Sequence, residues 1–331
     1  MIGASVARRN ARLAAGVFLC AALGGCATLI PQTVELRDAR PAGLPERVEL
    51  AGVPFFPQKD YQCGPAALAT ELASFDVKVT PDELVSQVYL PARKGSLQVE
   101  MLAAPRRYGM VSYQLAPRFE DLLREVASGT PVIVLQNYGF GPFPVWHYAV
   151  VAGYDYASGE VILRSGEKKR LTAPFGALEY TWKKSGYWAM VASRPERIPV
   201  TASESSYLAA IAALERAGDA NAAGRAYEAF LARWPDNLPA AIGLANSRYA
   251  LGDLAAAESV LRRASERHPA SAALLNNLAQ VLSDQGRNRE ALATIERASA
   301  LEGPYAQAVR DTRELILERL KKKADPPGAG R

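Results

Sequence analysis

The sequence predicts an α+β domain, built from an N-terminal helix and an antiparallel sheet, followed by an all-α solenoid of helical repeats. Apolar, strand-like runs predict the sheet; they lie at 132–135, 147–155, 160–163 and 187–191. Most aromatic residues and many prolines also precede residue 200, whereas the later chain is rich in alanine and shows a 34-residue period. A chain of 331 residues is long enough for both domains.

Residues 1–25 resemble a bacterial lipoprotein signal peptide. Three arginines within residues 8–12 precede an apolar run at 13–23, which is too short to span a bilayer as a helix. The run leads to Leu23-Gly24-Gly25-Cys26, so we expect lipidation of Cys26; an ordinary secretory peptide cut nearby is the alternative. Ala27 is similar to the pattern of lipoproteins sorted to the outer membrane. We therefore expect an outer-membrane lipoprotein that faces the periplasm and holds the lipid membrane through acylated Cys26.

Charge and cysteine content restrict the function of the remaining chain. The net charge is +5, and no basic stripe is interleaved with aromatic residues, so we expect no nucleic-acid partner. The cysteines are Cys20, Cys26 and Cys63, which leaves Cys63 as the free thiol after processing and excludes an internal disulfide. Neither a metal nor an organic cofactor is implied.

The expected domain boundaries follow the changes in composition. A linker at 26–46 separates the lipid anchor from the α+β domain at 47–195. A second linker at 196–203, in a stretch with two prolines, leads to the repeats. We expect three repeats at 204–304, a capping helix at 305–322 and a disordered tail at 323–331.

The second domain repeats glycine, small and large apolar positions in register. Glycine recurs at 218, 252 and 286, alanine at 223, 257 and 291, and a larger apolar residue at 227, 261 and 295. This pattern resembles the tetratricopeptide repeat, in which paired helices stack and offer a concave surface to a partner. A generic alanine-rich bundle is the alternative.

Cys63 is the candidate nucleophile. It precedes Gly64-Pro65 and a helical pattern at 66–75, and proline suits the first turn of a helix. A thiol at a helix N-terminus faces the positive end of the helix dipole, so we expect a lowered pKa and a favoured thiolate. Gln58 stands five residues upstream, and its side-chain amide can donate a hydrogen bond to an oxyanion.

His147 is the candidate base, because it is one of only two histidines. It opens the strand at 147–155, after an aromatic loop. The other histidine, His268, lies directly before Pro269 in a turn between repeats, with no second metal ligand nearby, so we expect a solvated turn there. If the chain performs nucleophilic catalysis, Cys63 and His147 must supply the thiol and the base.

Three sequence blocks resemble the papain-like cysteine peptidases that process bacteriocin leaders at double-glycine sites. The blocks are Gln58 with Cys63-Gly64-Pro65-Ala66-Ala67-Leu68, the run Gly-Thr-Pro-Val-Ile-Val at 129–134, and the strand that begins at His147. The resemblance spans residues 48–193. It implies a papain-like fold for this domain, with Cys63 as nucleophile, His147 as base and Gln58 as oxyanion donor.

One position departs from these peptidases. They place an aspartate, which orients the histidine, where this chain has Ser165. A serine hydroxyl can accept a hydrogen bond from the imidazole but stabilises imidazolium less than a carboxylate does. Asp155 lies near a strand turn, and we expect it to bond locally. The site is a dyad helped by Ser165, has reduced activity, or takes its third group from elsewhere.

These observations favour a membrane-anchored periplasmic cysteine peptidase that hydrolyses a peptide bond through a Cys–His dyad. Its partners would be a peptide or protein substrate, with leader processing of an exported protein as one such reaction, and a protein bound to the repeats. Two alternatives stay open. The missing aspartate motivates a weak or inactive peptide-binding lipoprotein, and outer-membrane placement motivates a peptidoglycan amidase or endopeptidase.

Overall fold

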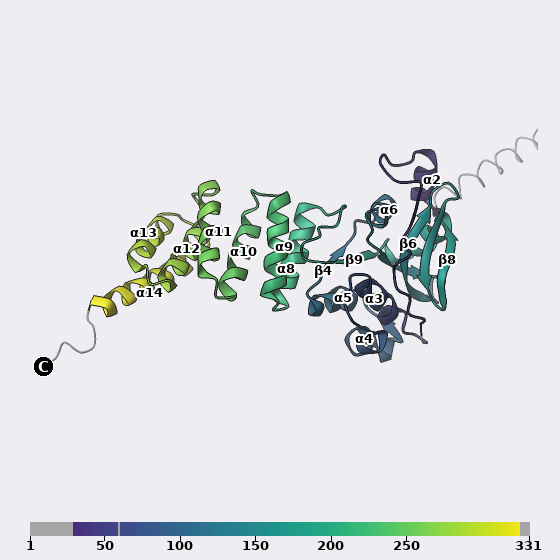
Figure 1. Ribbon diagram of the computed structural model, residues 1–331, viewed down its shortest axis with the longest axis horizontal. Helices are drawn as coiled ribbons and strands as arrows, with labels where there is room; N and C mark the ends of the chain where they lie inside the picture. Colours follow the sequence, from purple (N-terminus) through teal and green to yellow (C-terminus); the bar gives the residue numbers. More distant parts are fainter. Residues whose placement is uncertain (1–28, 59, 325–331) are drawn as a thin grey trace, which may run out of the picture. The chain divides into compact units, whose positions relative to one another are not determined.

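The computed structural model describes residues 29–58 and 60–324, which form two compact units (Figure 1). The first unit holds most residues up to 192 together with Pro199–Ala202, and the second holds Arg106–Val111, Ser193–Ile198 and the chain from Ser203 on. The predicted leader, Cys26 and most of the predicted tail lie outside the described residues. No helix in the described part of the chain is both long and apolar enough to cross a membrane.

A seven-stranded sheet forms the centre of the first unit, in the order β4-β9-β5-β6-β7-β8 with β1 paired to the far end of β6. All six residues of β5 are buried, which explains why this strand is a continuous apolar run rather than an alternating one. The pairs β5–β6, β6–β7 and β5–β9 are antiparallel, as predicted, and β8, which was not predicted, pairs antiparallel with β7. The strands are β1 Arg47–Glu49, β4 Val111–Gln114, β5 Val132–Asn137, β6 Trp146–Asp155, β7 Glu160–Ser165, β8 Lys168–Pro174 and β9 Ala189–Ser193.

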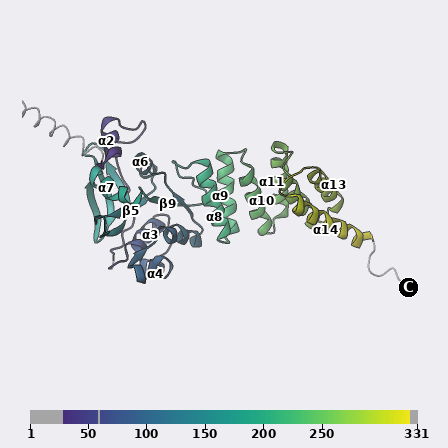
Figure 2. The same ribbon diagram turned by 180° about the vertical axis from the view of Figure 1, so that it is seen from behind.

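Helices pack on the sheet. Helix α3 lies against β6, and helix α7 lies against β5. Figure 2 shows α7 and β5 in the view from behind. Gln136 of β5 bonds to Thr181 of α7, while its neighbour Leu135 borders a cleft next to α3, so the two helices cover opposite faces of the sheet. The helices are α2 Pro31–Asp38, α3 Cys63–Ala73, α4 Pro81–Val88, α5 Gln98–Ala103, α6 Phe119–Ala127 and α7 Phe175–Trp182; a hairpin of β2 Tyr89–Leu90 and β3 Gly95–Ser96 follows α4.

The linker expected at 26–46 contains a docked helix instead. The carboxylate of Glu179 accepts hydrogen bonds from the backbone N–H groups of Gln32 (3.0 Å) and Thr33 (2.6 Å), which are free donors in the first turn of α2. Thr33 and Leu36 are buried. The sequence of this segment resembles a linker because no neighbouring residue indicates that the helix is fixed. Its partner, Glu179, lies far away in the sequence.

The linker expected at 196–203 is likewise ordered. The backbone N–H and the hydroxyl of Thr201 both donate to the carboxylate of Glu125, at 2.8 and 2.7 Å. Ala202 is buried. Part of this stretch belongs to each compact unit, so it is a packed segment rather than an extended spacer.

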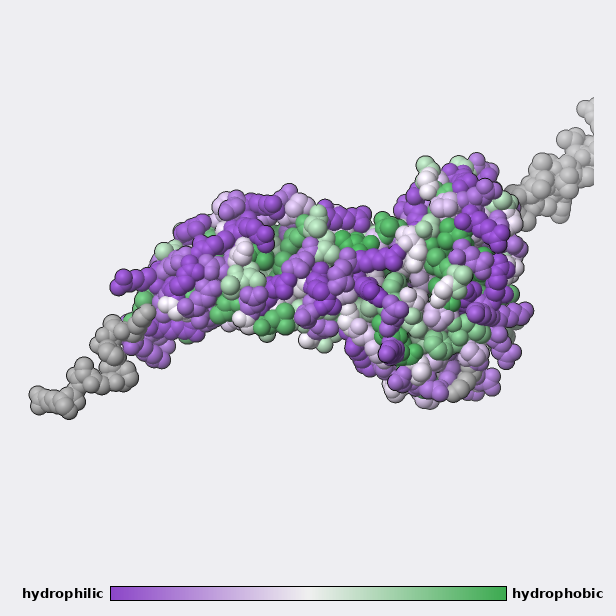
Figure 3. Space-filling model, viewed as in Figure 1, coloured by the Kyte–Doolittle hydropathy of each residue, from purple (hydrophilic) through white to green (hydrophobic). Residues whose placement is uncertain are grey.

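The second unit is the predicted series of helix pairs. Its small residues at 223, 257 and 291 are fully buried, which allows close packing between helices, and the visible outer surface is largely hydrophilic (Figure 3). Three pairs precede the final helix, which confirms the predicted solenoid. The helices are α8 Glu204–Arg216, α9 Ala220–Arg233, α10 Leu238–Ala250, α11 Leu254–Arg267, α12 Ala272–Asp284, α13 Asn288–Ser299 and α14 Ala306–Ala324.

The 34-residue glycine signal corresponds to a repeated turn. Gly218, Gly252 and Gly286 have φ of 94°, 77° and 79°, a left-handed conformation that glycine adopts at little cost. Asp219 and Asp253 then cap α9 and α11, each accepting a hydrogen bond from a backbone N–H three residues on, at 2.8 and 3.0 Å. His268 caps the C-terminus of α11 and its Nε2 lies 3.0 Å from the carbonyl oxygen of Asp236, which fits the local turn expected for it.

Candidate active site

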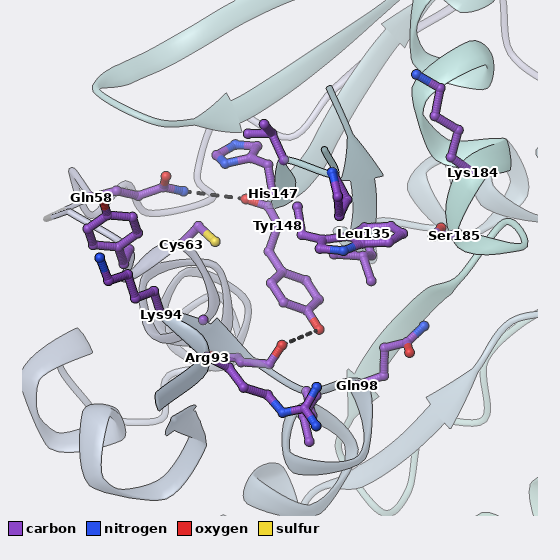
Figure 4. A pocket seen from close by; sticks show the side chains of 17 residues that line it. Gln58, Cys63, Arg93, Lys94, Gln98, Leu135, His147, Tyr148, Lys184 and Ser185 are labelled. Atoms are coloured by element: carbon purple, nitrogen blue, oxygen red, sulfur yellow. Dashed lines mark hydrogen bonds between the residues drawn. The ribbon is translucent and has the colours of Figure 1, made fainter. Parts of the chain in front are cut away.

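A cleft of about 810 Å³ in the first unit brings Gln58, Cys63 and His147 together (Figure 4). It lies beside the first residues of β6, whose ladder with β7 begins only at Val150. Because no strand among the described residues covers this edge of β6, its backbone borders the cleft directly. The other lining residues are Tyr61, Arg93, Lys94, Gly95, Ser96, Leu97, Gln98, Leu135, Pro144, Val145, Trp146, Tyr148, Lys184 and Ser185.

Cys63 is the first residue of α3, at the end of the helix that faces the cleft. Burial raises the pKa of its thiol, and the backbone N–H groups of Tyr148, Gly64 and Cys63 itself act in the opposite direction. The expectation of a lowered pKa is therefore wrong. Cys63 does lie at a helix N-terminus, but the loss of water around the sulfur outweighs the hydrogen bonds from these backbone N–H groups.

Close packing around the start of α3 also explains the glycine at position 64. A Cβ atom at this position would lie 2.2 Å from Oγ of Ser96, so a side chain cannot be placed there without moving the β2–β3 hairpin. The glycine of the Cys-Gly-Pro motif thus allows β3 to approach the start of α3. This approach forms one wall of the cleft.

His147 is the second residue of β6, and its Nε2 lies 2.8 Å from Oγ of Ser165, the last residue of β7. Burial lowers the pKa of His147 to about 4, so the imidazole is neutral at neutral pH. If Nε2 carries the ring proton and donates it to Ser165, Nδ1 presents a lone pair. Together with the raised thiol pKa, this describes a neutral thiol and a neutral imidazole rather than an ion pair.

A group of neutral residues that was not predicted from the sequence lies behind His147. The ring of Tyr138 stacks on the imidazole, with centroids 5.4 Å apart, and its hydroxyl donates to Oε1 of Gln136 at 3.1 Å. Nε2 of Gln136 donates in turn to Oγ1 of Thr181 at 2.7 Å. Gln136 is buried directly opposite His147 in the β5–β6 register, so the strand alternation contained the signal that could have found it.

Gln58 is held from two sides. Its backbone N–H donates to the carbonyl of Gly166 at 3.2 Å, and its side-chain Nε2 donates to the carbonyl of Tyr148 at 3.4 Å. A carboxamide nitrogen has two N–H donors, so one remains for another acceptor. Tyr148 can offer its carbonyl to Gln58, and its N–H to the Cys63 sulfur, because β7 does not pair with this part of β6.

Asp155 lies at the opposite end of β6, away from the cleft. It accepts a hydrogen bond from the backbone N–H of Ser158 at 3.2 Å and faces Arg47 at 3.8 Å, which is the local bonding expected for it. Within residues 29–58 and 60–324, no group of three or more His, Cys, Asp or Glu side chains is placed to hold a metal ion.

Comparisons with known proteins find two family models that match parts of the chain. Residues 50–190 match the model of the Peptidase_C39 like family, and residues 214–273 and 248–310 match that of a tetratricopeptide repeat. The comparison with curated proteins found no match.

Several solved structures are similar to parts of the chain. One is a C39-like peptidase from Bacillus anthracis, with 19% identity over 44% of this chain and 96% of that one and a TM-score of 0.37. Another is a double glycine motif protease from an AMS/PCAT transporter in complex with a leader peptide, with 20% identity, 42% and 90% coverage and a TM-score of 0.32. A thermophilic TPR protein from Thermus thermophilus shows 23% identity, 38% and 76% coverage and a TM-score of 0.32.

Proposed function

We propose that this chain, which carries a Peptidase_C39-like domain followed by tetratricopeptide repeats, is a cysteine peptidase that hydrolyses a peptide bond in the cleft beside β6. The observation that supports this most is the convergence of Gln58, Cys63 and His147 on one cleft while Ser165 holds Nε2 of the histidine. A nucleophile, a base and a group that orients the base are the three parts that such catalysis requires.

The first half of the reaction forms an acyl-enzyme. Nδ1 of His147 takes the thiol proton as the Cys63 sulfur attacks the substrate carbonyl carbon. The oxyanion that forms accepts a hydrogen bond from the free N–H of Gln58. The C–N bond then breaks, His147 returns the proton to the leaving amine, and a thioester remains on Cys63.

The second half releases the product. His147 removes a proton from water, the hydroxide attacks the thioester carbon, and the acid leaves as the thiol is reprotonated. The neutral resting pair means that proton transfer accompanies attack, since no thiolate is stored beforehand. Ser165 and the stacked ring of Tyr138 keep the imidazole in place during both proton transfers.

Peptide cleavage tests the proposal without a known substrate. The purified full chain is incubated with a proteome-derived peptide library, and new peptide ends are identified by mass spectrometry. We expect cleavage that is lost in Cys63→Ala and in His147→Ala and retained in His268→Ala, which removes the other histidine, in the repeat unit. Cleavage that persists in Cys63→Ala and His147→Ala would refute the assignment.

The neutral thiol and imidazole also support a second candidate, a peptide-binding protein without turnover. The same library separates the two functions. A binding protein retains peptides on immobilised wild-type chain but leaves every peptide intact. A peptidase forms a thioester that can be trapped and detected as a mass increase on the peptide containing Cys63.

The proposal includes a membrane anchor and a binding role for the repeats. Lipidation of Cys26 at the outer membrane would hold the peptidase on the periplasmic face, and the repeats would bind a substrate protein or a partner. Fractionation of cells that produce Cys26→Ala tests the anchor. We expect this variant in the soluble periplasmic fraction and the wild type in the membrane fraction after a high-salt wash; retention of both would contradict the anchor.

A further inference from the structure

One wall of the cleft is positively charged. Arg93 and Lys94 stand next to each other in the turn between β2 and β3, and Figure 4 places both on the side of Cys63 away from His147. Lys184 is a third basic residue of the cleft, whereas none of the lining residues is an aspartate or a glutamate. The cleft therefore has an unbalanced positive charge next to the proposed nucleophile.

The turn that carries this charge is fixed in place. The backbone N–H of Lys94 donates to the carbonyl of Pro91 at 3.1 Å, and Lys94 has a left-handed φ of 47°. On the other side of the hairpin, the carbonyl of Ser96 accepts a hydrogen bond from the hydroxyl of Tyr148 at 3.2 Å. Ser96 also packs against Gly64, directly after Cys63. These contacts fix the hairpin backbone, from which Arg93 and Lys94 extend, next to the start of α3.

The three basic residues differ in how far they are already used. Nζ of Lys184 donates to the carbonyl of Gly139 at 2.8 Å and lies over the ring of Tyr180, so it has a structural role. Arg93 and Lys94 are exposed. Lys94 lies 5.3 Å from the ring centroid of Tyr61, and neither residue forms an ion pair within the part of the chain that the structure describes. Their charges are available to a ligand.

We infer that Arg93 and Lys94 form an anion subsite that selects a carboxylate side chain of the peptide substrate, on the β2–β3 side of the bond that is cleaved. The inference rests on the proposed function in one respect, that a peptide lies across Cys63. Arginine can bind a carboxylate through two parallel hydrogen bonds, and lysine adds a second charge. The N-terminus of α3, at Cys63, adds partial positive charge to the same cleft. The substrate class is therefore an acidic peptide.

Binding to a chain that cannot cleave tests the subsite separately from catalysis. The probe is a decapeptide array in which each position is varied among Glu, Gln and Lys, and the protein is full-length Cys63→Ala carrying a fluorescent label. We expect Glu at one or two neighbouring positions to bind roughly three- to tenfold better than Gln, the range for one or two exposed ion pairs. The preference should decrease as the salt concentration rises.

Matched variants identify the residues responsible. Adding Arg93→Gln and Lys94→Asn to Cys63→Ala should abolish the preference for Glu; asparagine is chosen because it tolerates the left-handed backbone. Adding Lys168→Gln and Lys169→Gln, which neutralises two exposed lysines of β8, should leave the preference intact. Adding Arg93→Glu and Lys94→Glu should make Lys the preferred residue. Thermal melts confirm that each protein is folded.

Three results would overturn the subsite: equal binding of Glu and Gln peptides, a Glu preference that survives loss of both cations, or no binding of any peptide. The proposed function is judged by a different result, Cys63-dependent cleavage of the library. A chain that cleaves peptides without a Glu preference keeps the function and loses the subsite. A chain that binds acidic peptides through Arg93 and Lys94 without cleaving them keeps the subsite and loses the function.

Discussion

Replacing Ser165 by alanine removes the hydroxyl that lies 2.8 Å from Nε2 of His147. Ser165 is 7% exposed, so water does not readily take its place. Leaving a buried donor unsatisfied costs about 1–3 kcal/mol. Since about 1.4 kcal/mol corresponds to a tenfold change in rate, we expect kcat/KM to fall about tenfold and by no more than about 150-fold. Loss of the base itself, in His147→Ala, should cost more.

Replacing Ser165 by aspartate changes the charge beside the imidazole. Burial lowers the pKa of His147 to about 4, so the wild-type base stays deprotonated, and active, down to about that pH. A neighbouring carboxylate favours imidazolium and should raise the pKa of His147 by about one to three units. Because the base works in its deprotonated form, the acid limb of the kcat/KM profile should move to higher pH. Activity at neutral pH should be kept or increased, since the imidazolium formed during attack is stabilised.

The assay uses a fluorogenic version of a peptide cleaved from the library, followed from pH 4 to pH 8. Ser158→Ala is the matched control, because it removes an exposed serine from the turn between β6 and β7. Wild-type turnover by Ser165→Ala would show that Ser165 does not orient the base. An unchanged acid limb in Ser165→Asp would show that His147 is not the titrating base.

Three predictions concern stability. Burial raises the pKa of Glu71 above its ordinary 4.5. Above that pH the unfolded chain releases a proton that the folded chain keeps, so the free energy of unfolding falls as pH rises. Glu71→Gln should therefore raise Tm at pH 8 and change it less at pH 4. Gly64→Ala should lower the free energy of unfolding by about 1–3 kcal/mol in urea titrations because of its clash with Ser96, whereas Gly95→Ala, whose Cβ would lie 3.8 Å from its nearest neighbour, should be tolerated. Asp253→Ala should lower the free energy of unfolding by about 1 kcal/mol through loss of the α11 cap, and Asp253→Ser should restore most of that stability in thermal melts. Unchanged stability in Glu71→Gln, Gly64→Ala or Asp253→Ala would contradict the reasoning for that substitution.

The solenoid could be predicted because each of its signals meets a local requirement. The left-handed turns favour glycine at 218, 252 and 286, and close helix packing favours alanine at the buried positions 223, 257 and 291. Both residue types therefore recur in the sequence at the repeat period. The strands β5 and β6 could be predicted for a similar reason, since they are buried along almost their whole length. β8, whose residues are mostly exposed, has no apolar run and was missed.

The features that the sequence did not reveal depend on distant partners. Helix α2 is fixed by Glu179, and the ordered stretch around Thr201 by Glu125. The thiol of Cys63 illustrates the same limit at the site: its place at a helix N-terminus is a local property, but its burial depends on β6 and the β2–β3 hairpin. Proximity of Ser165 to His147 followed from strand order, whereas its role remains a prediction for the assay above.

If Cys26 carries the proposed lipid, the docking of α2 also limits how far the first unit could move from a membrane. Pro31 begins this helix five residues after Cys26, and five extended residues reach at most roughly 17 Å. A flexible tether of the roughly twenty residues first expected there would have reached roughly 70 Å. With a lipid on Cys26, the cleft would be confined to a thin layer above the bilayer. Peptides emerging from the membrane or attached to it would then meet the cleft at a raised effective concentration, while freely diffusing ones would gain nothing.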